Sequence, residues 1–181
     1  IFKKRYWILI LAVIFLAGAA VAAYGFVPVM KVGGKTIVFA EYLKTYSAIK
    51  SYDKISRRSA APAAEITRQA LETLVENRFL DILAERTNTD FKKEAERLVE
   101  DSIKTTPNLS LEEAAKKIYG LSETDFKRLV LLPQAEKDLL TQHYSYNPAE
   151  LQNLLNDLAK NAQIKIYYPG YYWDGEVKIK K

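Results

Sequence analysis

An uncharged apolar run, YWILILAVIFLAGAAVAAYGFVPVM, fills residues 6–30 and limits what this chain can fold into. As an α-helix its 25 residues would rise about 37 Å, more than the roughly 30 Å needed to cross a hydrocarbon core. Residues 1–30 are therefore predicted to form a cytoplasmic tip and a transmembrane anchor that contacts the lipid bilayer through residues 6–30. About 150 residues remain, which is the size of one ordinary domain.

A cleaved signal peptide is the alternative for this segment. Basic residues precede the run, and the small residues at 21–23 would suit a cleavage site. The run is nevertheless about twice as long as a normal signal-peptide core, and it continues through Phe26 and Val29. We favour an uncleaved anchor, while removal of residues 1–23 stays open.

The short basic N-terminus predicts the orientation. Positive charges flank the run on both sides, so their count alone does not decide: the N-terminal side has Lys3, Lys4 and Arg5, and the other side has Lys31, Lys35, Lys44 and Lys50. A five-residue N-terminus stays in the cytoplasm easily, whereas a long following domain is translocated largely regardless of its charge. We expect a single-pass protein of the plasma (inner) membrane, with the N-terminus cytoplasmic and the domain periplasmic or extracellular.

The residue inventory excludes most catalytic and metal chemistry. There is no Cys, which excludes disulfides, Cys-ligated zinc, iron–sulfur clusters and thiol nucleophiles. His143 is the single histidine, so a site needing two imidazoles would require a second chain. The acidic residues alternate with Lys and Arg at helical spacing, as solvated helix faces do. We therefore name no catalytic residue, cofactor or metal, and we expect no enzyme.

The net charge of +5 does not indicate nucleic-acid binding. Lys3, Lys4 and Arg5 contribute three of these charges, and the first acidic residue is Glu41. The domain itself is close to neutral, whereas a nucleic-acid-binding domain would gather basic residues on one face. We expect no nucleic-acid partner.

Hydrophobic periodicity predicts a mainly α-helical domain with short strands at both of its ends. Residues 31–39 (KVGGKTIVF) indicate a short strand or hairpin edge with a Gly33-Gly34 turn. Capping boxes start helices after Ser110 and Ser122, and Pro133 predicts a kink after Leu129. The predicted helices cover residues 39–49, 63–86, 91–102, 111–119, 123–144 and 148–162, followed by strands at 164–168 and 171–180.

The last predicted helix carries a narrow leucine stripe, which should dock on the helical body. The stripe consists of Leu151, Leu154, Leu155 and Leu158. Docking would return the strand at 164–168 to the one around Thr36 to Val38, so the two should pair. The apolar arc of the helix at 63–86 should then face a groove between the N-terminal and kinked helices.

Two features suggest contact surfaces for a client polypeptide or a membrane. Arg78 lies among apolar residues of the longest helix, next to Phe79, so it must snorkel, find an acid or face a groove; we favour snorkelling. Residues 169–181 form an aromatic and basic tail or hairpin containing Tyr171, Tyr172 and Trp173. These aromatics would suit a packed hairpin as well as a peptide-binding or membrane-interface surface.

The order of these features resembles a known family. The matching segments are GGKTIVFAEY, LETLVENRFLDILAERTN, YGLSETDFKRLVLLPQAEKDLL and NLLNDLAKNAQIKIYY. They are similar to the N-terminal chaperone domain of the SurA, PrsA and PpiD group of extracytoplasmic folding factors. The resemblance covers residues 32–168 and includes Gly34, the helix Leu71 to Ala84, and the Gly120-Leu121-Ser122 start of a segment ending at Phe126.

This resemblance implies a SurA-N-like helical chaperone domain at residues 31–168, anchored as in PpiD. Its partners would be unfolded or exported polypeptides. Family members with isomerase activity carry a parvulin domain between the kinked and closing helices, and residues 142–147 leave no room for one. We expect a holdase without prolyl isomerase activity. A membrane-anchored structural or adaptor protein for one partner is the alternative, and the sequence indicates neither the client nor the oligomeric state.

Overall fold

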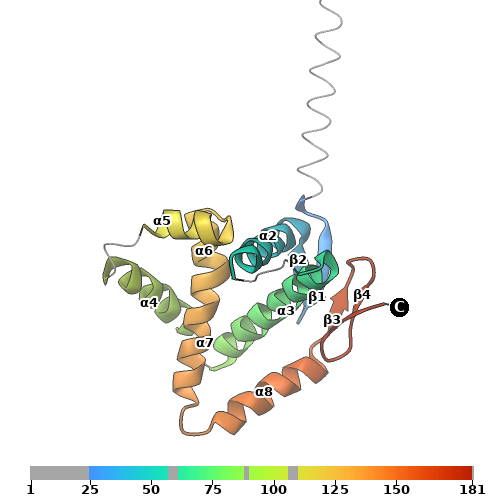
Figure 1. Cartoon of the computed structure of the whole chain (residues 1–181). Coiled ribbons are helices and arrows are strands. Elements are labelled where there is room, and N and C mark those ends of the chain that lie inside the picture. The colour runs from blue at the N-terminus through green and yellow to red at the C-terminus, as the bar shows by residue number, and fades with distance from the viewer. Residues whose placement is uncertain (1–24, 57–60, 88–89, 106–109, 181) are drawn as a thin grey trace, which may run out of the picture.

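The computed structural model describes residues 25–56, 61–87, 90–105 and 110–180 (Figure 1). Most of the predicted transmembrane anchor lies outside these residues. Within them, no helix is both long and apolar enough to cross a bilayer.

The predicted end of the anchor at Met30 is wrong. Residues Pro28–Val32 form strand β1 of the domain, and Val29 and Met30 are almost completely buried in its core. Pro28 favours extended backbone at the start of this strand because its ring fixes φ, removes an N–H and disfavours helix at the residue before it. The domain thus begins before Lys31.

The elements confirm a mainly helical domain with small antiparallel sheets that use both ends of the chain. The α-helices are α2 (Phe39–Ser56), α3 (Ala63–Thr87), α4 (Phe91–Thr105), α5 (Leu111–Ala114), α6 (Glu123–Phe126), α7 (Leu132–His143) and α8 (Pro148–Asn161). The π-helical turns are η1 (Ala115–Tyr119) and η2 (Lys127–Leu131). The strands are β1 (Pro28–Val32), β2 (Lys35–Val38), β3 (Ile164–Ile166), β4 (Tyr171–Trp173) and β5 (Val177–Ile179).

Strands from the two ends of the chain pair as predicted, but the strand after α8 pairs with a different partner from the one predicted. The larger sheet has the order β2-β1-β3, and β3 pairs with β1, with Met30 opposite Ile166. The predicted pairing of this strand with Thr36 to Val38 is wrong because β1 lies between them. Residues 28–30, predicted to lie in the membrane, belong to this central strand.

Helix α3 forms the centre of the domain, where it contacts α2, α4, α7, α8 and β5. In Figure 1 it crosses the middle of the domain, with α7 beside its C-terminal part and α8 below. Its apolar residues Leu71, Leu74 and Val75 are buried, so they form the core instead of facing an open groove. The leucine stripe of α8 docks on this core as predicted, with Leu158 buried and its other members partly buried.

The predicted caps and the predicted irregularity at Pro133 are present. Ser110 and Ser122 accept hydrogen bonds from the backbone N–H groups of Glu113 and Asp125, at 3.2 and 3.1 Å. Gly120 ends η1 in the left-handed conformation, at φ 65°. Instead of a simple break, the chain forms η2, where Leu132 N–H donates to Lys127 O five residues earlier. This hydrogen-bonding pattern accommodates Pro133, which has no backbone N–H to donate.

Candidate functional site

The aromatic tail is mainly a packed hairpin. Tyr171 is buried, and its hydroxyl donates to Ala64 O at 3.0 Å. Trp173 donates from Nε1 to Ala159 O at 3.2 Å and meets Phe79 edge-on, with ring centroids 6.2 Å apart. Of the proposed aromatic contact residues, Phe79 and Tyr171 are thus core residues and Trp173 is anchored against α8. Tyr172 remains available at the surface, 39% exposed.

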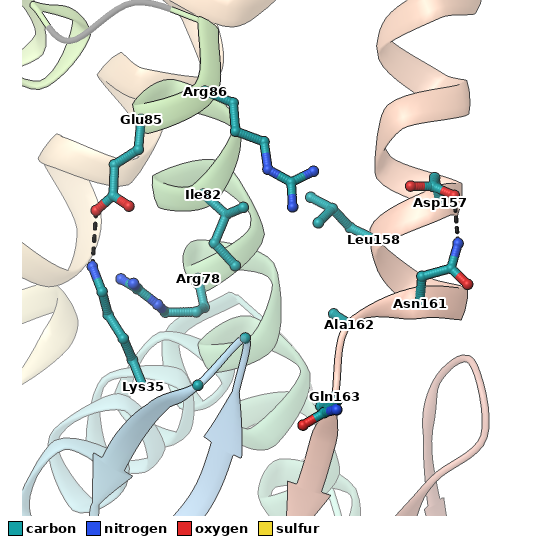
Figure 2. Close-up of a pocket in the computed structure, with 12 residues that line it drawn as sticks. Lys35, Arg78, Ile82, Glu85, Arg86, Asp157, Leu158, Asn161, Ala162 and Gln163 are labelled. Atoms are coloured by element: carbon teal, nitrogen blue, oxygen red, sulfur yellow. Dashed lines mark hydrogen bonds and ion pairs between the residues drawn. The ribbon is translucent and has the colours of Figure 1, made fainter.

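Arg78 lines a charged cavity of about 390 Å³ between the β1–β2 turn, α3 and the end of α8 (Figure 2). Its guanidinium pairs with Asp81, and its side chain is only 11% exposed. Of the three alternatives for Arg78, the structure therefore shows the acidic partner, not snorkelling. Arg78 Nε is buried without a hydrogen-bond partner.

Two of the other charged groups of this cavity, Lys35 and Glu85, neutralise one another. Lys35 Nζ donates to Glu85 Oε1 at 2.8 Å, and this bond lowers the pKa of Glu85. Asp157 accepts a hydrogen bond from Asn161 on the opposite wall. Figure 2 shows Arg86 reaching from α3 toward Leu158 on α8. Among the residues that line this cavity there is no nucleophile with a neighbouring base, so we assign it no reaction.

A second cavity is almost wholly apolar and lies between helices α2 and α3 and the two π-turns. Its volume is about 140 Å³. We call it the α2 groove; it is lined by Thr45, Ala48, Ile49, Tyr52, Thr73, Tyr119, Leu129 and Val130. A groove between the N-terminal and kinked helices was predicted, but its floor is formed by α2 and the π-turns more than by the central helix.

Two π-turns shape one wall of the α2 groove. Tyr119 belongs to η1, and Leu129 and Val130 belong to η2. Tyr119 stacks on Tyr52 of α2, with centroids 5.7 Å apart and planes 10° from parallel. Single π-turns within α-helices occur frequently at functional sites. Both π-turns of the described chain contribute to this one groove, which distinguishes it from the charged cavity.

Thr45 is a buried polar residue in the lining of the α2 groove. It is only 5% exposed, and its hydroxyl has no hydrogen-bond partner. Leaving a buried hydroxyl unpaired costs about 1 to 3 kcal/mol. The groove therefore contains one unsatisfied hydrogen-bonding group surrounded by apolar surface. The sequence pattern did not mark Thr45 as part of a site.

No protein-family model, curated protein or solved structure matches this chain.

Proposed function

We propose that this protein is a membrane-anchored extracytoplasmic holdase that binds unfolded segments of exported polypeptides in the α2 groove, without prolyl isomerase activity. The observation that carries the proposal is an almost wholly apolar groove that is lined from both π-turns of the described chain. An unfolded polypeptide exposes apolar side chains that this groove can bury.

The size of the groove fits one side chain at a time. An apolar cavity of about 150 Å³ accepts a molecule as large as benzene, so the α2 groove has room for one aromatic or aliphatic side chain. Binding of one such side chain recognises no particular sequence, as expected for a protein with many clients.

Exposed apolar residues extend this surface along α2. Tyr52 is 50% exposed and Ile55 is 60% exposed, and both follow Thr45 and Ala48 at helical spacing. Weak binding of many unfolded segments requires open apolar surface, whereas one dedicated partner would bury about 800 Å² on each side. A small groove with an open apolar margin favours the holdase over the adaptor.

The family resemblance supports the same proposal. Helices α7 and α8 are joined directly through residues 144–147, at the place where isomerases of the SurA, PrsA and PpiD group carry a parvulin domain. The compartment and the anchor are part of the proposal, because residues 6–24 form an uncharged apolar segment before the domain.

Filling the groove should remove holdase activity without unfolding the domain. Thr45→Leu replaces the unpaired hydroxyl by apolar volume, so we expect equal or higher thermal stability. The full-length chain in lipid nanodiscs should slow aggregation of an unfolded model protein, and the variant should do so several times less well. Light scattering measures the aggregation, and circular dichroism verifies the fold.

The matched control is Thr141→Leu, the same substitution on the exposed face of α7. It should retain wild-type holdase activity. If Thr45→Leu folds normally and protects as well as the wild type, the α2 groove is not the client site. If the wild type protects no unfolded protein but captures one defined partner in cells, the adaptor alternative replaces the holdase.

A further inference from the structure

A second apolar surface lies where the described chain begins. Phe26 is 77% exposed, Val27 is 44% exposed and Tyr167 is 44% exposed. A cavity of about 480 Å³ opens among them. It is lined by Val27, Pro28, Val29, Phe39, Tyr167, Tyr168 and Pro169. We call these lining residues, together with Phe26, the aromatic surface.

Backbone hydrogen bonds hold the segments of the aromatic surface together. Tyr167 N–H donates to Val29 O at 2.8 Å, and Phe39 N–H donates to Val27 O at 2.8 Å. The start of β1, the start of α2 and the chain after β3 thus meet at one end of the domain, as Figure 1 shows. These backbone hydrogen bonds fix the positions of the segments that carry the aromatic side chains.

Two lysines lie next to this surface on the outer face of the larger sheet. Lys31 of β1 is directly opposite Lys165 of β3, and both are exposed. Lys165 Nζ lies 5.4 Å from the centroid of the Tyr167 ring. No carboxylate of the described residues forms a salt bridge with either lysine. Aromatic rings with unpaired lysines beside them match the headgroup region of a bilayer, where tyrosines gather and anionic lipids attract basic residues.

The sequence before this surface specifies its position relative to a membrane. Residues 6–24 are 19 uncharged residues, which as a helix would rise about 28 Å, close to the thickness of a hydrocarbon core. Gly25 would then lie at the bilayer surface. Pro28 follows three residues later, so at most about 10 Å of chain separates the two. The aromatic surface cannot lie far from the lipid.

We propose that the aromatic surface and its two lysines dock on the headgroup region of the same bilayer, with the lysines contacting anionic phospholipid. This inference rests on the membrane anchor of the proposed function. Docking would fix the tilt of the domain, because a single connection at Gly25 would otherwise let it rotate.

Nitroxide labels in the full-length chain test this docking. The chain has no Cys, so one introduced cysteine gives one labelled site. Labels at Leu16→Cys, Pro169→Cys and Tyr146→Cys, in nanodiscs with anionic lipid, report the anchor, the aromatic surface and a distant loop. Tyr146 is fully exposed between α7 and α8. Collisions of the nitroxide with oxygen indicate a lipid environment, and collisions with a nickel chelate indicate exposure to water.

The label at 169 should be less accessible to the nickel chelate than the label at 146 and less accessible to oxygen than the label at 16, as expected in the headgroup region. Lys31→Gln combined with Lys165→Gln should shift the label at 169 toward water in anionic nanodiscs and change little in purely zwitterionic ones. A label at 169 that is as accessible to nickel as the label at 146, with the label at 16 shielded, would overturn the docking alone. A nickel-accessible label at 16 would overturn the anchor as well, and neither result depends on holdase activity.

Discussion

Glu136→Gln should stabilise the domain at pH 8 by about 2 to 4 kcal/mol and remove most of its pH dependence between pH 5 and 8. Glu136 is 2% exposed, and its Oε1 has no hydrogen-bond partner. Burial, with a smaller contribution from Asp81, raises the pKa of this carboxyl from 4.5 to about 7. Lys92 and Arg78 oppose the shift, and Glu85 adds to it.

The sign of the effect follows from this raised pKa. Between about pH 4.5 and pH 7 the folded state holds a proton on Glu136 that the unfolded state has lost. The free energy of unfolding of the wild type should therefore fall as the pH rises through this range. Glutamine keeps the shape without the charge. The gain in free energy of unfolding over the wild type should therefore be small at pH 4 and complete above about pH 7.

Chemical denaturation of the full chain in nanodiscs at several pH values measures this effect. Glu96→Gln, on the exposed face of α4, is the matched control and should change the pH dependence little. A wild-type stability that stays level from pH 5 to pH 8 would contradict the burial of a raised-pKa carboxyl at position 136. A Glu136→Gln variant that keeps the wild-type slope would contradict it as well.

Deleting residues 164–181 should abolish cooperative folding of the domain. The deletion removes β3, which pairs with the central strand β1, and the buried residues Tyr171 and Val177. It also removes Trp173 from its contacts with Phe79 and α8. Each large apolar side chain contributes about 1.5 to 3 kcal/mol on full burial, and small domains are stable by only about 5 to 15 kcal/mol.

Thermal melts followed by circular dichroism distinguish this structural role from a surface role of the tail. Tyr172→Ala changes the exposed aromatic residue of the same strand and should leave the melting temperature nearly unchanged. A truncated chain that still melts cooperatively at the wild-type temperature would show that the strands from the two ends do not close the fold.

Local sequence signals predicted the parts of the fold that depend on neighbouring residues. Ser110 and Ser122 cap helices because a hydroxyl reaches a backbone N–H three residues later, which requires no tertiary information. Gly120 closes a helix because its conformation suits glycine. Leu158 and the rest of its stripe predicted docking because their spacing leaves one apolar face.

Features that depend on tertiary packing were missed or misassigned. Hydropathy does not distinguish a buried strand from a membrane segment, so Val29 and Met30 were assigned to the anchor. Glu136 lies in a charged stretch, and only packing between helices makes it buried. Thr45 lines the α2 groove together with residues of η1 and η2, and a helical pattern does not encode those π-turns.

The most direct test of the holdase proposal is crosslinking in living cells from within the α2 groove. A photoreactive amino acid at position 52 replaces the half-exposed Tyr52, and one at position 146 provides the matched exposed control on the far loop. The proposal predicts that position 52 of the full chain captures many different exported polypeptides, that position 146 captures few, and that Thr45→Leu reduces the capture at 52. Equal capture at both positions, or one single partner at position 52, would contradict it.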